Sequence, residues 1–129
     1  MPTGNIKIIY TIIPIFCNLI QVGDTMERFT WKAFILPGML DEYIKRHDEI
    51  WPEMTQLLND AGIRNYTIWT TGEELFGYYE CDSVEFAAKV QRESEVVARW
   101  NVYMKDVMVM ATDPATGEPQ MLRQVFFHG

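Results

Sequence analysis

The sequence predicts an α+β fold in which a four-stranded antiparallel sheet carries helices on one face. Three observations favour it: short runs rich in β-branched and aromatic residues, two amphipathic helical stretches, and the order in which these alternate along the chain. A chain of 129 residues, 48% of them apolar, suits a single domain with a sizeable core.

The first half of this pattern is one strand followed by one long helix. Phe29–Leu36 is rich in β-favouring residues and ends at the turn signal Pro37-Gly38. Leu40–Gly62 then repeats apolar residues at the spacing of an amphipathic helix. Because this stripe keeps its phase across Pro52, we expect a kink there rather than a break, with Gly62 just past the helix end.

A hairpin and a second helical region are expected next. Ile63–Thr70 and Glu74–Cys81 are predicted strands, joined at Thr71–Glu73 by a turn of hairpin length that contains glycine. Asp82–Glu85 is a predicted capping box that opens a helix over roughly residues 83–91. A further amphipathic run carries apolar residues on one side: Val96, Val97, Trp100, Tyr103, Met104, Val107 and Met108.

The end of the chain is expected to be a loop and a strand. Thr112–Pro119 has the composition of a loop, and Gln120–Phe127 is the predicted final strand. The resulting order, βαββαβ, is that of the ferredoxin-like arrangement. Such a sheet leaves its second face bare, and we expect a second copy of the chain to cover it in a homodimer, as in a dimeric α+β barrel.

The first 25 residues differ from the rest. Ile8–Ile20 is almost wholly apolar, yet polar residues and a proline interrupt it, and it is shorter than the roughly 20 residues of a membrane span. We expect residues 1–25 to be an extension outside the fold, with Met26 as the natural start and residues 26–129 as the single domain. A signal or anchor, and an extra strand or helix, are the alternatives.

Composition and charge exclude several classes of function. Eleven basic against eighteen acidic residues give a net charge of −7, without the basic patch expected of a nucleic-acid partner. Cys17 and Cys81 have neither disulfide nor zinc spacing, which favours a reducing, cytoplasmic compartment. No glycine-rich nucleotide motif and no HExxH motif occurs, so neither a cofactor nor a metal is expected, and no membrane association is predicted.

Three side chains of the long helix are unusual for a core-facing stripe. Tyr43, His47 and Trp51 follow one another at steps of four and therefore lie along one side of the helix. The ordinary pKa of histidine lies near neutrality, where one imidazole can both give and take a proton. These residues alone leave two interpretations open, a satisfied core histidine and a catalytic one. Most of the many tyrosines and tryptophans are expected in the core or a dimer interface, and a sugar site is the alternative.

The stretch Glu42–Glu53, EYIKRHDEIWPE, resembles the L-rhamnose mutarotases. Further matches follow in the same order and extend the resemblance over about residues 30–127: Lys32-Ala33-Phe34, Asn65-Tyr66-x-Ile68, Arg99-Trp100, Tyr103-Met104-x-Asp106-Val107-Met108 and Gln124-Val125-Phe126. The resemblance implies an isomerase of carbohydrate metabolism, a homodimer without metal or cofactor, that interconverts the α and β anomers of L-rhamnopyranose or a close 6-deoxyhexose.

The resemblance also implies roles for individual residues. It makes His47 the proton donor and places Tyr43, Tyr66 and Trp100 against the sugar. Asn101 departs from the pattern, because the family often has a second tryptophan at that position, and the change leaves the preferred sugar open. Two other functions remain as alternatives, a monooxygenase-like enzyme on the same dimeric fold and a sugar-binding module without catalysis.

Overall fold

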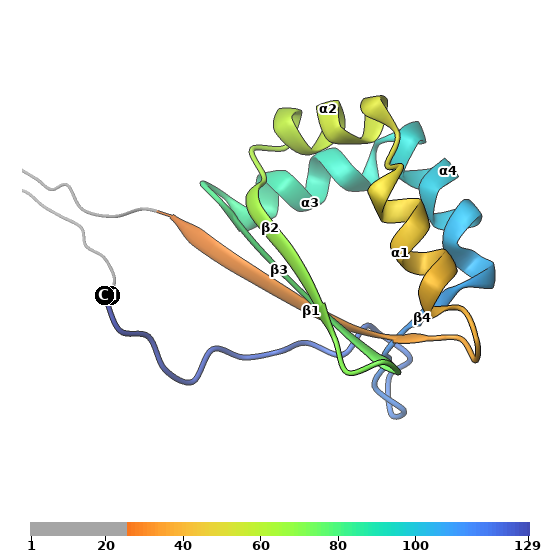
Figure 1. The fold of residues 1–129 in the computed structure, drawn as a ribbon. Coiled ribbons are helices and arrows are strands. Elements are labelled where there is room, and N and C mark those ends of the chain that lie inside the picture. The colour runs from red at the N-terminus through yellow and green to blue at the C-terminus, as the bar shows by residue number, and fades with distance from the viewer. Residues whose placement is uncertain (1–25) are drawn as a thin grey trace, which may run out of the picture.

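The computed structural model describes residues 26–129; the expectations for residues 1–25 and for a domain boundary at Met26 concern residues outside this range. Four antiparallel strands lie in the order β2-β3-β1-β4, and the helices cover one face of their sheet (Figure 1). This confirms the predicted fold class. The elements are β1 (Glu27–Ile35), α1 (Leu40–Asp48), α2 (Pro52–Asp60), β2 (Arg64–Thr70), β3 (Glu74–Cys81), α3 (Val84–Arg92), α4 (Glu95–Tyr103), η1 (Met104–Asp106) and β4 (Met108–Met110).

The predicted long helix is broken, so the expectation of a kink at Pro52 was wrong. Trp51 is extended, with φ −64° and ψ 136°, and Pro52 is the first residue of α2. The proline ring disfavours a helical conformation at the residue before it, and a proline costs nothing at the first position of a helix. Gly62 has φ 74° after the end of α2, as expected of the residue that follows a helix.

The hairpin and the helix that follows it form largely as predicted. β2 and β3 pair antiparallel, and alternate residues of β3 are buried, which is the pattern of a strand with one face on the core. The side chain of Ser83 caps α3 by accepting a hydrogen bond from the backbone N–H of Phe86 at 3.0 Å. Asp82, at the start of the predicted capping box, instead pairs with Arg64 at 2.9 Å.

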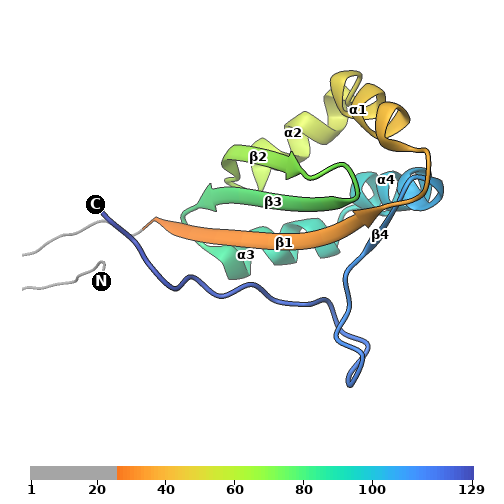
Figure 2. The ribbon, with the colours of Figure 1, turned by 60° about the horizontal axis from the view of Figure 1, so that its bottom comes forward.

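The predicted final strand at Gln120–Phe127 is not a strand in this chain, and this expectation was wrong. The fourth strand is β4, which pairs with β1 over Ala33–Ile35. After the Thr112–Pro119 loop, Gln120 donates its backbone N–H to Ala111 at 2.8 Å, and the segment then runs beside β1 without further ladder bonds among the described residues (Figure 2). The sequence of this segment favours a strand, but strand formation also requires a partner backbone.

The core consists of two clusters under the helices. The first holds Ala33, Ile35, Tyr43, Met54, Leu75, Trp100, Met104 and Val107, and the second holds Ala61, Ile63, Tyr79, Cys81 and Ala87. Trp31 packs against the first cluster and Tyr66 against the second. The indole N–H of Trp31 donates to the hydroxyl of Tyr66 at 2.9 Å, so a polar contact joins the two clusters.

Candidate active site

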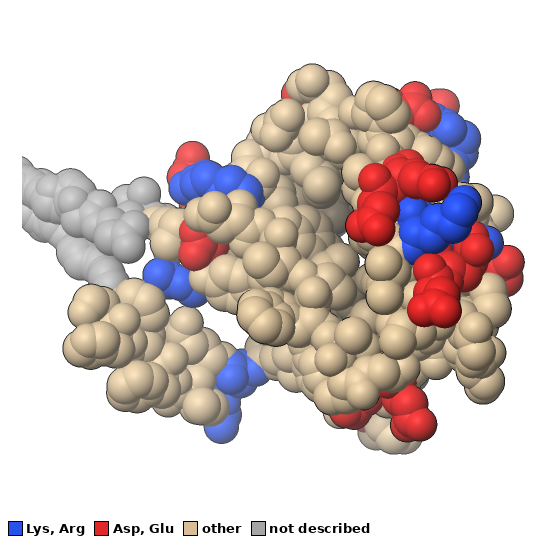
Figure 3. All heavy atoms as spheres, in the orientation of Figure 1, with Lys and Arg blue, Asp and Glu red and all other residues tan. Residues whose placement is uncertain are grey.

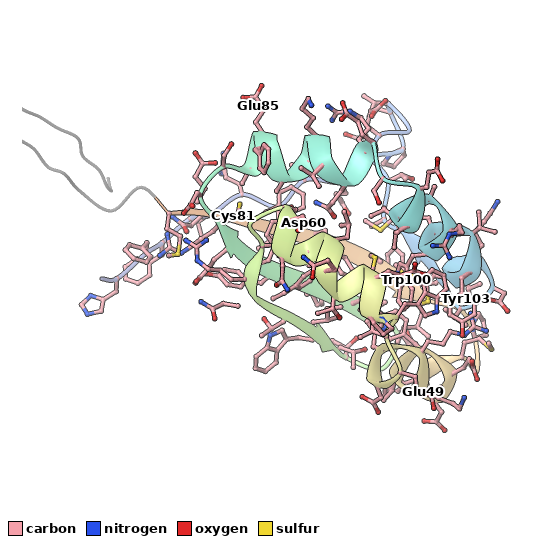
Figure 4. All side chains as sticks on the ribbon, turned by 90° about the horizontal axis from the view of Figure 1, so that it is seen from above. Glu49, Asp60, Cys81, Glu85, Trp100 and Tyr103 are labelled. Carbon is pink, nitrogen blue, oxygen red and sulfur yellow. The ribbon has the colours of Figure 1, made fainter. Side chains whose placement is uncertain are left out.

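An aromatic cluster forms where α1 and α4 meet above the sheet. The rings of Tyr43 and His47, one turn apart on α1, have centroids 4.3 Å apart. His47 meets the ring of Trp100 edge-on at 5.4 Å, and Trp51 at the helix break meets the same ring at 5.1 Å. Trp100 and Tyr103 lie on α4 beside α1 (Figure 4). Three residues predicted for the site, Tyr43, His47 and Trp100, therefore lie together.

The geometry determines which nitrogen of His47 carries the proton. Nδ1 lies 3.1 Å from the backbone oxygen of Tyr43, and since a carbonyl oxygen only accepts, Nδ1 donates. In the neutral ring Nε2 is then free to accept a proton. Burial lowers the pKa of His47 below its ordinary value of 6.5, and the hydrogen bond to Tyr43 and the charge of Asp48 offset only part of that effect. His47 is therefore a neutral base near neutral pH.

Arg46 fixes the helix that carries His47. Its guanidinium pairs with Glu42 at 2.7 Å and with Asp106 at 2.9 Å, and it donates to the backbone oxygen of Tyr103 at 2.6 Å. It also lies over the ring of Tyr103, 4.3 Å from the centroid. The hydrogen bond and charge of Arg46 hold the pKa of Asp106 below its usual range. These contacts tie α1 to the end of α4, which holds the imidazole against Trp100.

Two phenols face the interior of the protein: Tyr43 of this cluster, which is buried, and Tyr66 on β2, which is half-buried. Tyr43 is only 4% exposed, and its hydroxyl has no hydrogen-bond partner within residues 26–129. Burial and the neighbouring Tyr66 raise the pKa of Tyr43, and burial raises the pKa of Tyr66 to about 12. Both phenols therefore stay protonated and can donate hydrogen bonds. A buried hydroxyl without a protein partner is uncommon and calls for a partner from outside the protein.

A cavity of about 460 Å³ lies between the sheet and the helices α3 and α4. Trp31 and Tyr66 line it from the sheet, and Gln91 and Asn101 line it from the helices. Of the predicted site residues, Tyr66 and Asn101 therefore face the cavity, whereas Tyr43, His47 and Trp100 belong to the aromatic cluster. Trp31 connects the two groups, because it packs against the core cluster that holds Tyr43 and Trp100 and donates to the hydroxyl of Tyr66. Such a volume is in the range of small-molecule sites.

Trp31 is one of the lining residues that the sequence did not suggest for the site. It alternates with Phe29 and Ala33 along β1, and residues two apart on a strand share a face, so its position facing the helices was open to prediction. The contact of Trp31 with Tyr66 was not open to prediction, because that contact depends on the order of the strands in the sheet. Within the described part of the chain, no group of three or more His, Cys, Asp or Glu residues could hold a metal ion.

Comparison with known proteins identifies the family. A sequence model of a family described as L-rhamnose mutarotase matches residues 28–128. The chain belongs to the L-rhamnose mutarotase family. The matched range covers the helices and strands of this family member except for Glu27, the first residue of β1, and it includes all the candidate site residues.

Individual relatives agree with this assignment. An L-rhamnose mutarotase of Rhizobium johnstonii is 38% identical over 81% of this chain and 97% of its own length. One from Lachnoclostridium phytofermentans is 34% identical over 80% of this chain and 98% of its own. A crystal structure of an L-rhamnose mutarotase from Formosa agariphila superposes with a TM-score of 0.64 and 29% identity, over 80% of this chain and 99% of that one. None of the helices within residues 26–129 of this family member has the length and apolar character to cross a membrane.

Proposed function

We propose that this member of the L-rhamnose mutarotase family interconverts the α and β anomers of L-rhamnopyranose or a close 6-deoxyhexose. The observation that carries the proposal is the neutral imidazole of His47 beside the protonated phenol of Tyr43, with ring centroids 4.3 Å apart, on a chain that matches the family over residues 28–128. Anomer exchange needs one group that takes a proton and another that gives one, and nothing more.

The proposed steps transfer two protons, one from the anomeric hydroxyl to the protein and one from the protein to the ring oxygen. Nε2 of His47 accepts the proton of the anomeric hydroxyl as the carbonyl forms and the bond from the anomeric carbon to the ring oxygen breaks. A phenol of Tyr43 or Tyr66 gives its proton to the ring oxygen, which leaves as an alkoxide and is more basic than a phenolate. The aldehyde rotates about its bond to the second carbon, and the same transfers in reverse close the ring on the other face.

This scheme changes the role that the resemblance assigned to His47. The resemblance made His47 the proton donor, whereas an imidazole with a lowered pKa is mainly neutral before the sugar binds. We propose that it accepts the anomeric proton first and returns it when the ring closes. The aromatic faces of Trp100 and Trp51 and the amide of Asn101 are the proposed binding groups around the sugar.

The direct test of the proposed function is anomer exchange measured by magnetisation-transfer NMR, with L-rhamnose and L-fucose side by side. We expect the protein to accelerate exchange of L-rhamnose above the spontaneous rate. Saturable binding of L-rhamnose without acceleration would favour the non-catalytic sugar-binding module. Oxygen consumption with a quinol substrate, and no exchange, would favour the monooxygenase-like alternative.

The rate of exchange should depend on the protonation of His47. Its neutral form is the proposed base, and its pKa lies below 6.5 in the folded protein. The rate should therefore rise with pH through a single inflection below 6.5 and then stay level through neutral pH, because burial keeps both phenols protonated there. The measurement is the rate at saturating sugar against pH; a rate that falls as pH rises from acid to neutral would refute the scheme.

We also propose that the protein is a cytoplasmic homodimer, on the grounds of its C-terminal segment and of the sequence spacing of its two cysteines, which is not that of a disulfide framework. Trp69 on the open sheet face is 68% exposed, and Val125 and Phe126 of the segment are 82% and 80% exposed. Figure 3 shows the segment standing off the body of the molecule, which leaves apolar surface for a partner. A second copy would supply the backbone that Gln120–Phe127 needs to become a strand.

Light scattering after gel filtration tests the homodimer. The mass measured by light scattering should be twice the 15.1 kDa of one chain. The double substitution Val125→Ser and Phe126→Ser should lower the measured mass towards that of the monomer. Gln124→Ser, in the same segment, is the matched control and should leave the dimer intact. A full chain that remains monomeric at high micromolar concentration would refute the homodimer.

A further inference from the structure

We propose that Trp31, seated on Gly77, is a positioning residue that holds the hydroxyl of Tyr66 for the sugar and forms one wall of the cavity. This inference rests on the proposed function and extends it to a residue that the sequence did not suggest. Trp31 lies on β1, one of the two central strands, and lines the cavity together with Tyr66 and Asn101.

The hydrogen bond between Trp31 and Tyr66 has only one possible direction. An indole N–H donates and cannot accept, so the Tyr66 oxygen is the acceptor at 2.9 Å. The proton of Tyr66 must then point elsewhere, and within residues 26–129 it meets no acceptor. Because Trp31 is the donor in this bond, the O–H of Tyr66 is left free to donate. Tyr66 lines the cavity. A ligand oxygen is the partner that this arrangement fits.

Gly77 makes room for the indole. It lies opposite Trp31 in the ladder between β1 and β3. A Cβ atom at Gly77 would overlap the indole ring of Trp31. Its φ angle lies outside the left-handed region, so the backbone itself does not require glycine here. The absence of a side chain at Gly77 therefore leaves space for the indole of Trp31. In that space the indole lies against the sheet and reaches the hydroxyl of Tyr66.

The indole also contributes surface to the cavity. A tryptophan ring offers an apolar face, and the C–H face of a pyranose ring packs well on such a face. Asn101 lines the same cavity from α4 with an amide that can bond hydroxyl groups. We infer that the sugar lies between the indole on the sheet and the helix side of the cavity, where Gln91 and Asn101 supply amides, with Tyr66 donating to it at the edge of the indole.

The central test compares Trp31→Phe with Trp69→Phe. Both changes remove one indole N–H from a strand, but Trp69 is exposed on the other face and donates only to Thr67 at 3.1 Å. Trp31→Phe keeps an aromatic wall, so we expect KM for L-rhamnose to stay near the wild-type value while kcat falls about 3- to 10-fold, the loss of one hydrogen bond. Trp69→Phe should change neither constant.

A second readout reports on Tyr66 without any turnover. The hydrogen bond from Trp31 lowers the pKa of Tyr66 against the larger effect of burial, so Trp31→Phe should raise that pKa further. NMR of tyrosines labelled at the carbon that bears the hydroxyl follows this titration residue by residue. Gly77→Ala should give the same direction of change, because it displaces the indole; if Gly77→Ala fails to fold, the Trp31→Phe measurements decide.

The outcomes separate this inference from the proposed function. A wild-type protein that accelerates exchange, with a Trp31→Phe variant whose kcat and Tyr66 titration are both unchanged, would overturn the role of Trp31 alone. A folded wild-type protein that accelerates no anomer exchange would overturn the proposed function instead. A lower kcat together with a higher pKa of Tyr66 would support the positioning role, since a merely structural role would move stability rather than the titration of Tyr66.

Discussion

Replacing His47 with alanine should lower the protein-catalysed exchange of L-rhamnose anomers by about 10²–10⁴-fold, the usual contribution of a positioned acid–base group. The imidazole is the one group in the aromatic cluster that is a neutral base near neutral pH, because burial lowers its pKa and its Nδ1 is already bonded to Tyr43. The measurement is magnetisation-transfer NMR at saturating sugar.

His128 supplies a matched control for this substitution. It is the second of the two histidines in the chain and lies in the exposed C-terminal segment. His128→Ala should therefore exchange L-rhamnose anomers at the wild-type rate. A His47→Ala protein that keeps its circular dichroism spectrum and its full exchange rate would refute the assignment of His47.

Replacing Tyr43 with phenylalanine should lower the exchange rate on the order of 10²-fold, the effect of removing one donor that faces developing negative charge. The same change should leave the free energy of unfolding unchanged or raise it by about 1 kcal/mol. The reason is that the Tyr43 hydroxyl is buried without a protein partner, so its removal relieves a desolvation penalty. Activity and stability would thus move in opposite directions.

Urea unfolding and anomer exchange, measured on the same preparation, test this prediction. Tyr78→Phe is the matched control, because the hydroxyl of Tyr78 donates to Glu80 at 2.7 Å within a single strand and Tyr78 lines neither the cavity nor the aromatic cluster. It should leave the exchange rate unchanged. A Tyr43→Phe protein that is several kcal/mol less stable would show that the hydroxyl has a structural partner, contrary to the geometry.

Elements with a strong local signal were predictable from the sequence. The β2–β3 hairpin, the start of α3 at Ser83 and the turn at Gly62 depend on residues close together in the chain. The break before Pro52 was misjudged because the apolar stripe continues in phase through it. That stripe reports which face is buried, whereas the conformation of Trp51 depends on a local clash with the proline ring.

The last strand could not be predicted for a different reason. Gln120–Phe127 has strand composition, but whether it forms a strand depends on a partner backbone that the sequence of one chain does not identify. β4 takes the edge position beside β1 with only three residues. Propensity describes a segment, and pairing is a property of the whole sheet.

The residues of the candidate site were likewise predictable only in part. Helical spacing alone placed Tyr43, His47 and Trp51 on one side, and family resemblance added Tyr66, Trp100 and Asn101. Trp31 and Gly77 were missed, because they lie on two strands that are far apart in sequence. They come into contact only because the register of the sheet places them opposite each other. The direction of the His47 pKa shift also had to come from the structure, since it follows from burial.

The central claim is that the sugar binds with its anomeric centre at Nε2 of His47, and NMR of the imidazole nitrogens tests it most directly. The protein, labelled with ¹⁵N in its histidines, would be titrated with L-rhamnose, with His128 as an internal control in the same spectrum. We expect the Nε2 signal of His47 to shift and saturate while its Nδ1 stays protonated and His128 does not move. Saturable binding of L-rhamnose that leaves both nitrogens of His47 unshifted would contradict the account.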